Sequence, residues 1–201
     1  MPPAYIADAD GRPMHSWRVL LLPFLDQNDL YKQYRFDEPW NGPHNRKLMS
    51  ARPRIYALND EVSQQGQETN YLAIVGQDTS WPGAGAYKPL RDEAKKQSPI
   101  MVVENVGSGI SWLEPRDLVL DAMDLSMAAE SSRGISSRYQ PPAVVTVNGD
   151  VLTLPLDLAP EALRKMLVVT NPAALKHDPN VKRIDDGRDR PLKGSATAAE
   201  R

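Results

Sequence analysis

The chain has 201 residues, of which 41% are hydrophobic and 25% are charged, so it is long and apolar enough for one domain with a buried core, or one domain with a tail. Its net charge of −2 and its scattered basic residues give no electrostatic support for a nucleic-acid partner. Cysteine is absent, which excludes disulfides, thiolate metal sites and cysteine nucleophiles. The longest apolar run, 19–25, is too short to span a bilayer.

The stretch from His15 to Leu48 carries the strongest pattern in the first half of the chain. Ser16 stands at an N-cap position, and Pro23 interrupts the helix that follows, so we expect a second helix through about Tyr34. After the turn PWNGP we expect a third short helix over 44–50. Apolar residues at helical spacing predict one buried face, made of Trp17, Leu20, Leu21, Phe24 and Leu25.

The middle of the chain predicts strands separated by loops. Residues 54–58 and 69–75 are rich in β-forming residues and predict two strands. The polar residues 59–68 and the Gly- and Pro-rich residues 76–89 predict exposed loops. Residues 98–104 are apolar enough to predict a strand in the centre of a sheet.

A β-hairpin is the clearest local signal near the C-terminus. Residues 144–147 and 151–154 flank Asn148-Gly149, a pair that favours a type I′ turn. Residues 158–169 predict a helix with Leu163, Met166 and Leu167 on one face.

The last thirty residues differ in composition from the rest. Residues 172–201 are polar and poor in large apolar groups, so they predict a mobile tail. The sequence therefore predicts one α+β domain over 1–171, with an antiparallel sheet, short N-terminal helices, a late hairpin and a C-terminal helix.

Complete catalytic and metal-binding motifs are missing from the sequence. The three histidines, His15, His44 and His177, have no zinc-ligand spacing. No nucleophile elbow and no phosphate loop is present, and Asp8–Gly11 predicts a turn. We therefore predict no catalytic residue, no metal and no cofactor.

Three carboxylates near predicted strand ends could still converge. Glu104, Glu114 and Asp117 could form an acid–base pair or bind a cation. The favoured interpretation is structural, with Glu104 and Glu114 bound by Arg116 or by backbone donors, because structural ion pairs outnumber catalytic carboxylates.

The four tryptophans divide into two groups. Trp17 and Trp40 are predicted to anchor the core, because aromatic residues at helical spacing usually do so. For Trp81 and Trp112 the sequence does not decide between a structural role and a ligand-binding surface. Together with Glu114 and Asp117 they form the candidate ligand-binding set.

Several motifs together indicate a family. The segments SWRVLLLPFL, DEPWNGPHNRKL, TNYLAIVG, a strand ending VVE, and WLEPRDL occur in order within residues 1–170. They resemble a large planctomycete family of unknown function that is described as pseudopilin-like and sometimes labelled a solute-binding-protein family. The resemblance implies a pilin-like fold, an inner-membrane anchor helix before Met1 and a periplasmic location. Tyr139 and Asn148-Gly149 stand where members commonly carry His and Asp-Gly.

The resemblance and the missing motifs lead to one expected function. We expect a non-enzymatic cell-envelope protein, a pseudopilin-like ectodomain, related to type II secretion, that acts through assembly or protein binding with other pseudopilin or envelope proteins. Without the anchor helix the chain is expected to be largely monomeric. The alternative is a binding module for a small solute, sugar or peptide around Trp81 and Trp112. A hydrolase using Glu104, Glu114 or Asp117 ranks last.

Overall fold

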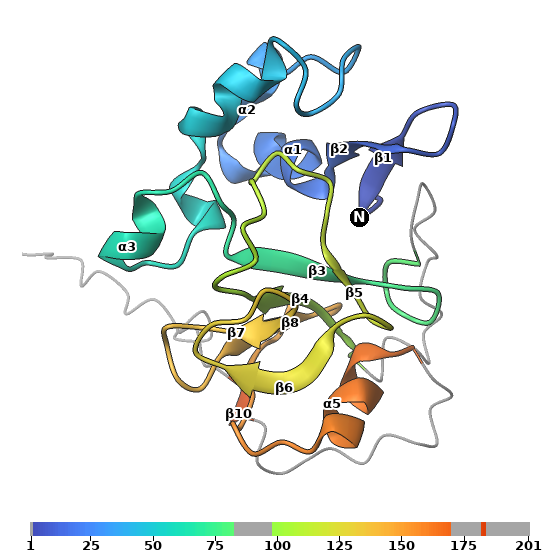
Figure 1. Cartoon of the computed structure of the whole chain (residues 1–201), viewed down its shortest axis with the longest axis vertical. Coiled ribbons are helices and arrows are strands. Elements are labelled where there is room, and N and C mark those ends of the chain that lie inside the picture. Colours follow the sequence, from blue (N-terminus) through green and yellow to red (C-terminus); the bar gives the residue numbers. More distant parts are fainter. Residues whose placement is uncertain (1, 83–97, 170–181, 184–201) are drawn as a thin grey trace, which may run out of the picture.

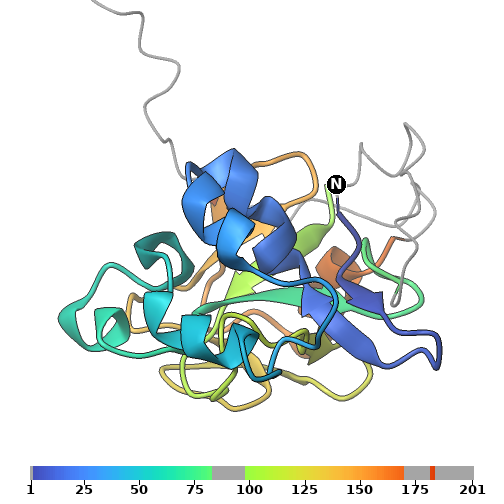
Figure 2. The ribbon, with the colours of Figure 1, turned by 90° about the horizontal axis from the view of Figure 1, so that it is seen from above.

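A six-stranded sheet runs through the centre of the computed structural model, which describes residues 2–82, 98–169 and 182–183 (Figure 1). The N-terminal hairpin and helices lie on one side of this sheet. On the other side lie α5 (Pro160–Leu167) and strands β6 (Asp124–Ala128) and β7 (Gly134–Ser136) (Figure 1). The view from above shows the N-terminal helices projecting over the sheet (Figure 2). The predicted α+β fold with a C-terminal helix is confirmed.

The strand order of the central sheet is β10-β9-β8-β4-β3-β5. Neighbouring strands are antiparallel, except β3 and β5, which are parallel. The prediction of a purely antiparallel sheet is therefore wrong at this edge. Its strands are β3 (Tyr71–Val75), β4 (Ile100–Glu104), β5 (Leu118–Val119), β8 (Ala143–Thr146), β9 (Val151–Thr153) and β10 (Lys182–Arg183). Two smaller pairs accompany it: antiparallel β1 (Tyr5–Ala7) with β2 (Pro13–Ser16), and parallel β6 (Asp124–Ala128) with β7 (Gly134–Ser136).

Most of the predicted strands form, and one does not. Residues 69–75 and 98–104 give β3 and β4, and β4 lies inside the sheet as predicted. The strand predicted over 54–58 is wrong: a 3-10 helix, η3 (Arg54–Tyr56), forms instead, because the Tyr56 N–H donates to the Pro53 carbonyl. The predicted loop over 59–68 contains a short helix, α3 (Glu61–Gln64), capped by the preceding aspartate.

The predicted hairpin is confirmed between β8 and β9, but its turn differs from type I′. Gly149 has φ +83°, whereas Asn148 is not among the residues with positive φ. The Gly149 N–H donates to the Thr146 carbonyl, and the Thr146 N–H donates to the Asp150 carbonyl. This is a three-residue loop closed by a left-handed glycine rather than a two-residue loop.

The N-terminal helices follow the predicted order, but their buried face differs from the predicted one: Val19 and Leu22 are fully buried, whereas Leu20, Leu21 and Leu25 are only partly buried. These helices are α1 (Trp17–Leu21), η1 (Leu22–Leu25), α2 (Asn28–Gln33) and η2 (Asn45–Ala51), and η1 and η2 are 3-10 helices. The Ser16 hydroxyl caps α1 by accepting from the Arg18 N–H, as predicted. Phe24 was expected on the buried face, yet 81% of it is exposed. The tighter 3-10 turn around Pro23 rotates the chain further per residue than the α-helical spacing assumes.

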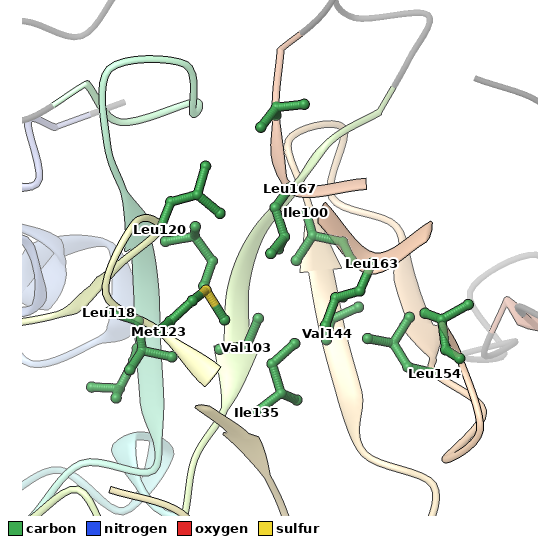
Figure 3. Packing of buried hydrophobic residues seen from close by; sticks show 14 of the residues in the cluster. Ile100, Val103, Leu118, Leu120, Met123, Ile135, Val144, Leu154, Leu163 and Leu167 are labelled. Carbon is green, nitrogen blue, oxygen red and sulfur yellow. The ribbon is translucent and has the colours of Figure 1, made fainter. Parts of the chain in front are cut away.

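The main core fills the space between the sheet and α5. Side chains from β4 and β8 meet Leu163 and Leu167 of α5, while Leu118, Leu120 and Met123 close the other end (Figure 3). Both leucines of α5 are fully buried, which confirms the predicted helix face. On the opposite face of the sheet, Ala73 packs with Trp17 and Trp81.

The predicted mobile tail, 172–201, and the domain end at 171 lie almost wholly outside the described residues. The exception is β10, in which Lys182 pairs with Thr153 of β9. Within the described residues, no helix is both long and apolar enough to cross a membrane.

Candidate functional site

A cleft of about 560 Å³ lies between the β1–β2 hairpin and the sheet edge formed by β5. The segment 114–119 forms one wall, and the hairpin contributes to the other. Most of the wall is apolar, from Tyr5, Pro13, Trp40, Pro82, Pro115 and Val119. Clefts of this size and lining are the usual form of a binding site, so this cleft is the candidate functional site.

The wall 114–119 is held in place by Arg18, whose side chain is fully buried. Its position in the first turn of α1 directs the guanidinium toward the loop before β5. Every one of its five N–H groups has an acceptor, which a buried guanidinium requires. The acceptors are Asp117 Oδ1 at 2.8 Å and the carbonyl oxygens of Tyr71, Trp112, Glu114 and Arg116.

Asp117 completes this buried anchor beneath the cleft wall. Its carboxylate also accepts from the Ala73 N–H at 2.8 Å and from the Trp17 indole N–H at 3.2 Å. Burial raises the pKa of Asp117, and the charge of Arg18 opposes that rise. Arg18 and Asp117 therefore act as one buried ion pair that joins α1, β3 and the cleft wall.

The mouth of the cleft carries a second, exposed ion pair. The Arg116 Nε donates to Glu114 Oε1 at 2.6 Å. The Arg116 side chain is 57% exposed, whereas that of Glu114 is 18% exposed. The guanidinium therefore faces solvent and is oriented by the carboxylate next to it.

Trp40 reaches the cleft from a turn that is stabilised by buried amide and carboxylate groups. Asn45 is fully buried, and its side chain bonds the backbone N–H of Arg35 and three carbonyl oxygens of residues 35–39. Glu38 accepts from the backbone N–H groups of His44 and Asn45. The Trp40 N–H donates to the Met14 carbonyl, which ties the turn to β2.

The structure separates the four predicted ligand-binding residues into two groups. Glu114 and Asp117 line the cleft. Trp81 and Trp112 are buried in different clusters, and their indole N–H groups donate to the carbonyls of Pro2 and Met49. The two tryptophans therefore support the folded chain around the cleft and do not line it.

Most of the other predicted aromatic and acidic residues hold structural positions, such as Trp17, which is buried against Trp81. Trp40, predicted to anchor the core, is only half-buried and lines the cleft. Glu104 is buried at the end of β4 and accepts from the Ala143 N–H at 2.8 Å, which matches the backbone-donor interpretation. Burial raises the pKa of Glu104. Glu114 pairs with Arg116, as favoured from the sequence.

Sequence reasoning missed Arg18 and the hairpin side of the cleft. Arg18 interrupts an apolar run between Trp17 and Val19, and a lone charge in such a run is the signal that could have indicated a buried partner. Tyr5 and Pro13 carry no comparable signal, since their role depends on where the hairpin packs.

Metal-binding groups are not gathered at this site. Among the described residues, no three His, Cys, Asp or Glu side chains are placed to hold a metal ion. The carboxylates at the cleft are instead engaged by arginines.

A family model described as "Protein of unknown function (DUF1559)", labelled SBP_bac_10, matches residues 1–106, more than half of the chain. The chain belongs to the DUF1559 family. Comparisons with curated proteins and with solved structures gave no match.

The DUF1559 match divides the cleft into two parts. It includes the β1–β2 hairpin, the turn with Trp40, and Arg18. The wall 114–119, with Asp117, lies after the matched residues. The DUF1559 region therefore supplies the arginine of the buried ion pair, and the following segment supplies its carboxylate.

Proposed function

We propose that this DUF1559 protein is a non-enzymatic, pseudopilin-like ectodomain on the periplasmic side of the inner membrane, where it acts through assembly or protein binding. The planctomycete pseudopilin-like resemblance of its motifs supports this location. The observation that carries the proposal is the apolar cleft whose neighbouring carboxylates are already bound: Asp117 by Arg18 and Glu114 by Arg116.

The chemistry of the cleft supports binding over catalysis. A general acid or base must be free to exchange a proton with a substrate. Glu114 and Asp117 are each held by a guanidinium, and the remaining walls are mainly apolar and aromatic. A cleft with apolar and aromatic walls and a few oriented polar groups is suited to binding a side chain of a partner protein.

Cell fractionation of the native protein tests the envelope proposal. We expect it in the membrane fraction, with a mature N-terminus upstream of Met1 that includes a long apolar helix. A native protein that is recovered in the soluble fraction and starts at Met1 would contradict the envelope location.

A small solute is the second candidate, because the cleft volume falls in the range of small-molecule sites, about 300–1,000 Å³. A thermal-shift screen with sugars, amino acids and short peptides tests it, since a ligand of the native state must raise the apparent stability. Val119→Arg, which places a long charged side chain at the cleft wall, is the matched control. If no compound at millimolar concentration stabilises the wild type more than this variant, the solute hypothesis fails.

A further inference from the structure

Phe24 is the most exposed large hydrophobic residue among those described, at 81%. One exposed apolar side chain is ordinary on a protein surface and carries no conclusion by itself. Phe24 differs in lying on a restrained turn of the backbone. Pro23 precedes it, Leu22 is fully buried, and the left-handed Asp26 (φ 57°) ends the 3-10 turn. Little backbone entropy would be lost when this turn docks on a partner.

An acidic group accompanies the exposed ring. Asp26 is exposed two residues after Phe24, and the Asp29 side chain is 95% exposed. Phe24 and Asp26 therefore place one exposed aromatic ring and one exposed carboxylate on the same turn, called the knob below.

The cleft offers the complementary chemistry. Its apolar wall includes Trp40 and Val119, and Val119 is 50% exposed. At its mouth, the Arg116 side chain is 57% exposed, and its guanidinium donates only to Glu114 among the described residues, through Nε and Nη2. The Nη1 group is therefore able to donate to a further carboxylate.

We propose that a second copy of this chain inserts Phe24 into the cleft and places Asp26 against Arg116. This inference rests on the proposed assembly function and names its partner. Phe24 does not line the cleft, so the knob and the cleft are different parts of the surface. Contact between different surfaces of identical chains is heterologous and repeats head to tail.

The proposed contact is small and therefore weak in dilute solution. A single aromatic anchor with one ion pair buries too little surface for a stable dimer. The free chain remains largely monomeric at micromolar concentration. Copies that share a membrane surface gain effective concentration, and the contact then contributes to assembly.

Two complementary variants test the contact. Phe24→Asp removes the knob and leaves the cleft, and Val119→Arg places a long charged side chain at the cleft wall and leaves the knob. Both positions are exposed enough for the fold to persist, which a circular-dichroism melt checks. The control is Val62→Asp, which alters an apolar residue that is 62% exposed outside the knob and the cleft.

Sedimentation velocity is measured up to millimolar concentration. We expect wild type and Val62→Asp to form dimers and longer species, and each of the other variants alone to associate at least about tenfold more weakly. A mixture of Phe24→Asp with Val119→Arg is expected to form a one-to-one dimer and nothing longer, because one intact knob and one intact cleft remain.

Three results would overturn the inference: a wild type that stays monomeric at millimolar concentration, self-association that Phe24→Asp does not weaken, or a mixture that forms no dimer. These results leave the proposed function standing if the native protein fractionates with the envelope. In cells, a photo-crosslinker at position 24 that joins only a different protein would likewise reject self-assembly and retain protein binding.

Discussion

Arg18 and Asp117 lie 99 residues apart in the sequence, yet their side chains form a buried ion pair with 2.8 Å between Nη1 and Oδ1. The guanidinium also donates to the carbonyl oxygens of Glu114 and Arg116 within the cleft wall, and of Trp112 just before it. This one side chain therefore fixes the shape of a loop that has little regular secondary structure of its own.

Removing one partner of this pair should destabilise the fold strongly. Asp117→Asn preserves the side-chain volume but leaves a buried guanidinium without its counter-charge. The expected loss in the free energy of unfolding is about 3–5 kcal/mol. Urea unfolding followed by tryptophan fluorescence measures it.

The control for this prediction is an ion pair at the surface. Arg12 Nη1 lies 2.9 Å from Asp10 Oδ2, and the two side chains are 74% and 67% exposed. Asp10→Asn should change the free energy of unfolding by less than about 1 kcal/mol, because water already solvates both charges. Equal losses for Asp117→Asn and Asp10→Asn would show that the buried pair contributes no more to stability than the surface pair.

Local rules predicted much of the fold. Ser16 caps α1 because its hydroxyl can reach the Arg18 N–H, a rule that depends only on nearby residues. The β-branched and aliphatic residues of 69–75 and 98–104 predicted β3 and β4, and Asn148-Gly149 predicted the hairpin although not its type of turn.

The cleft could be predicted only in part, because it is formed by segments distant in sequence. Glu114 and Asp117 were selected as candidate residues, but the buried partner of Asp117 is set by how α1 packs on β3. Phe24 was placed wrongly because the periodicity assumes α-helical rotation, which the 3-10 turn does not follow.

Asn45 should be essential for the turn that presents Trp40. Its buried amide bonds four backbone groups of the segment 35–39, and Asn45→Ala leaves those groups without partners. We expect a loss of roughly 1–3 kcal/mol in the free energy of unfolding. Asn41→Ala, at an exposed position of the same turn, is the control and should stay within about 0.5 kcal/mol of wild type. Similar losses for both variants would contradict this role.

Gly149 should resist substitution because of its backbone conformation alone. An added Cβ meets no atom within 4 Å, but φ is +83°. Gly149→Ala should therefore lower the free energy of unfolding by about 1–2 kcal/mol, the usual strain of a left-handed residue with a side chain. Gly66→Ala, where φ is not positive and a Cβ would lie 3.7 Å from the nearest atom, is the control. A neutral Gly149→Ala variant would show that the turn adjusts freely.

His15 should make stability depend on pH below about 6.5. It is buried, its Nδ1 lies 2.9 Å from the Tyr34 hydroxyl, and burial lowers its pKa from 6.5. The unfolded chain therefore binds a proton at a higher pH than the folded chain does. The contribution of neutral His15 to the free energy of unfolding is complete above pH 6.5. It is lost as the pH falls below 6.5, with a slope of up to about 1.4 kcal/mol per pH unit.

Urea unfolding of wild type and His15→Gln between pH 5 and 7.5 measures this dependence. We expect the wild type to lose stability more steeply than His15→Gln as the pH falls, whatever their difference at pH 7.5. His44→Gln is the matched control, because His44 lies nearer the surface and bonds the Gln33 carbonyl. It should retain the steep dependence of the wild type. If His15→Gln loses stability as steeply as the wild type, another group sets the acid sensitivity of this fold.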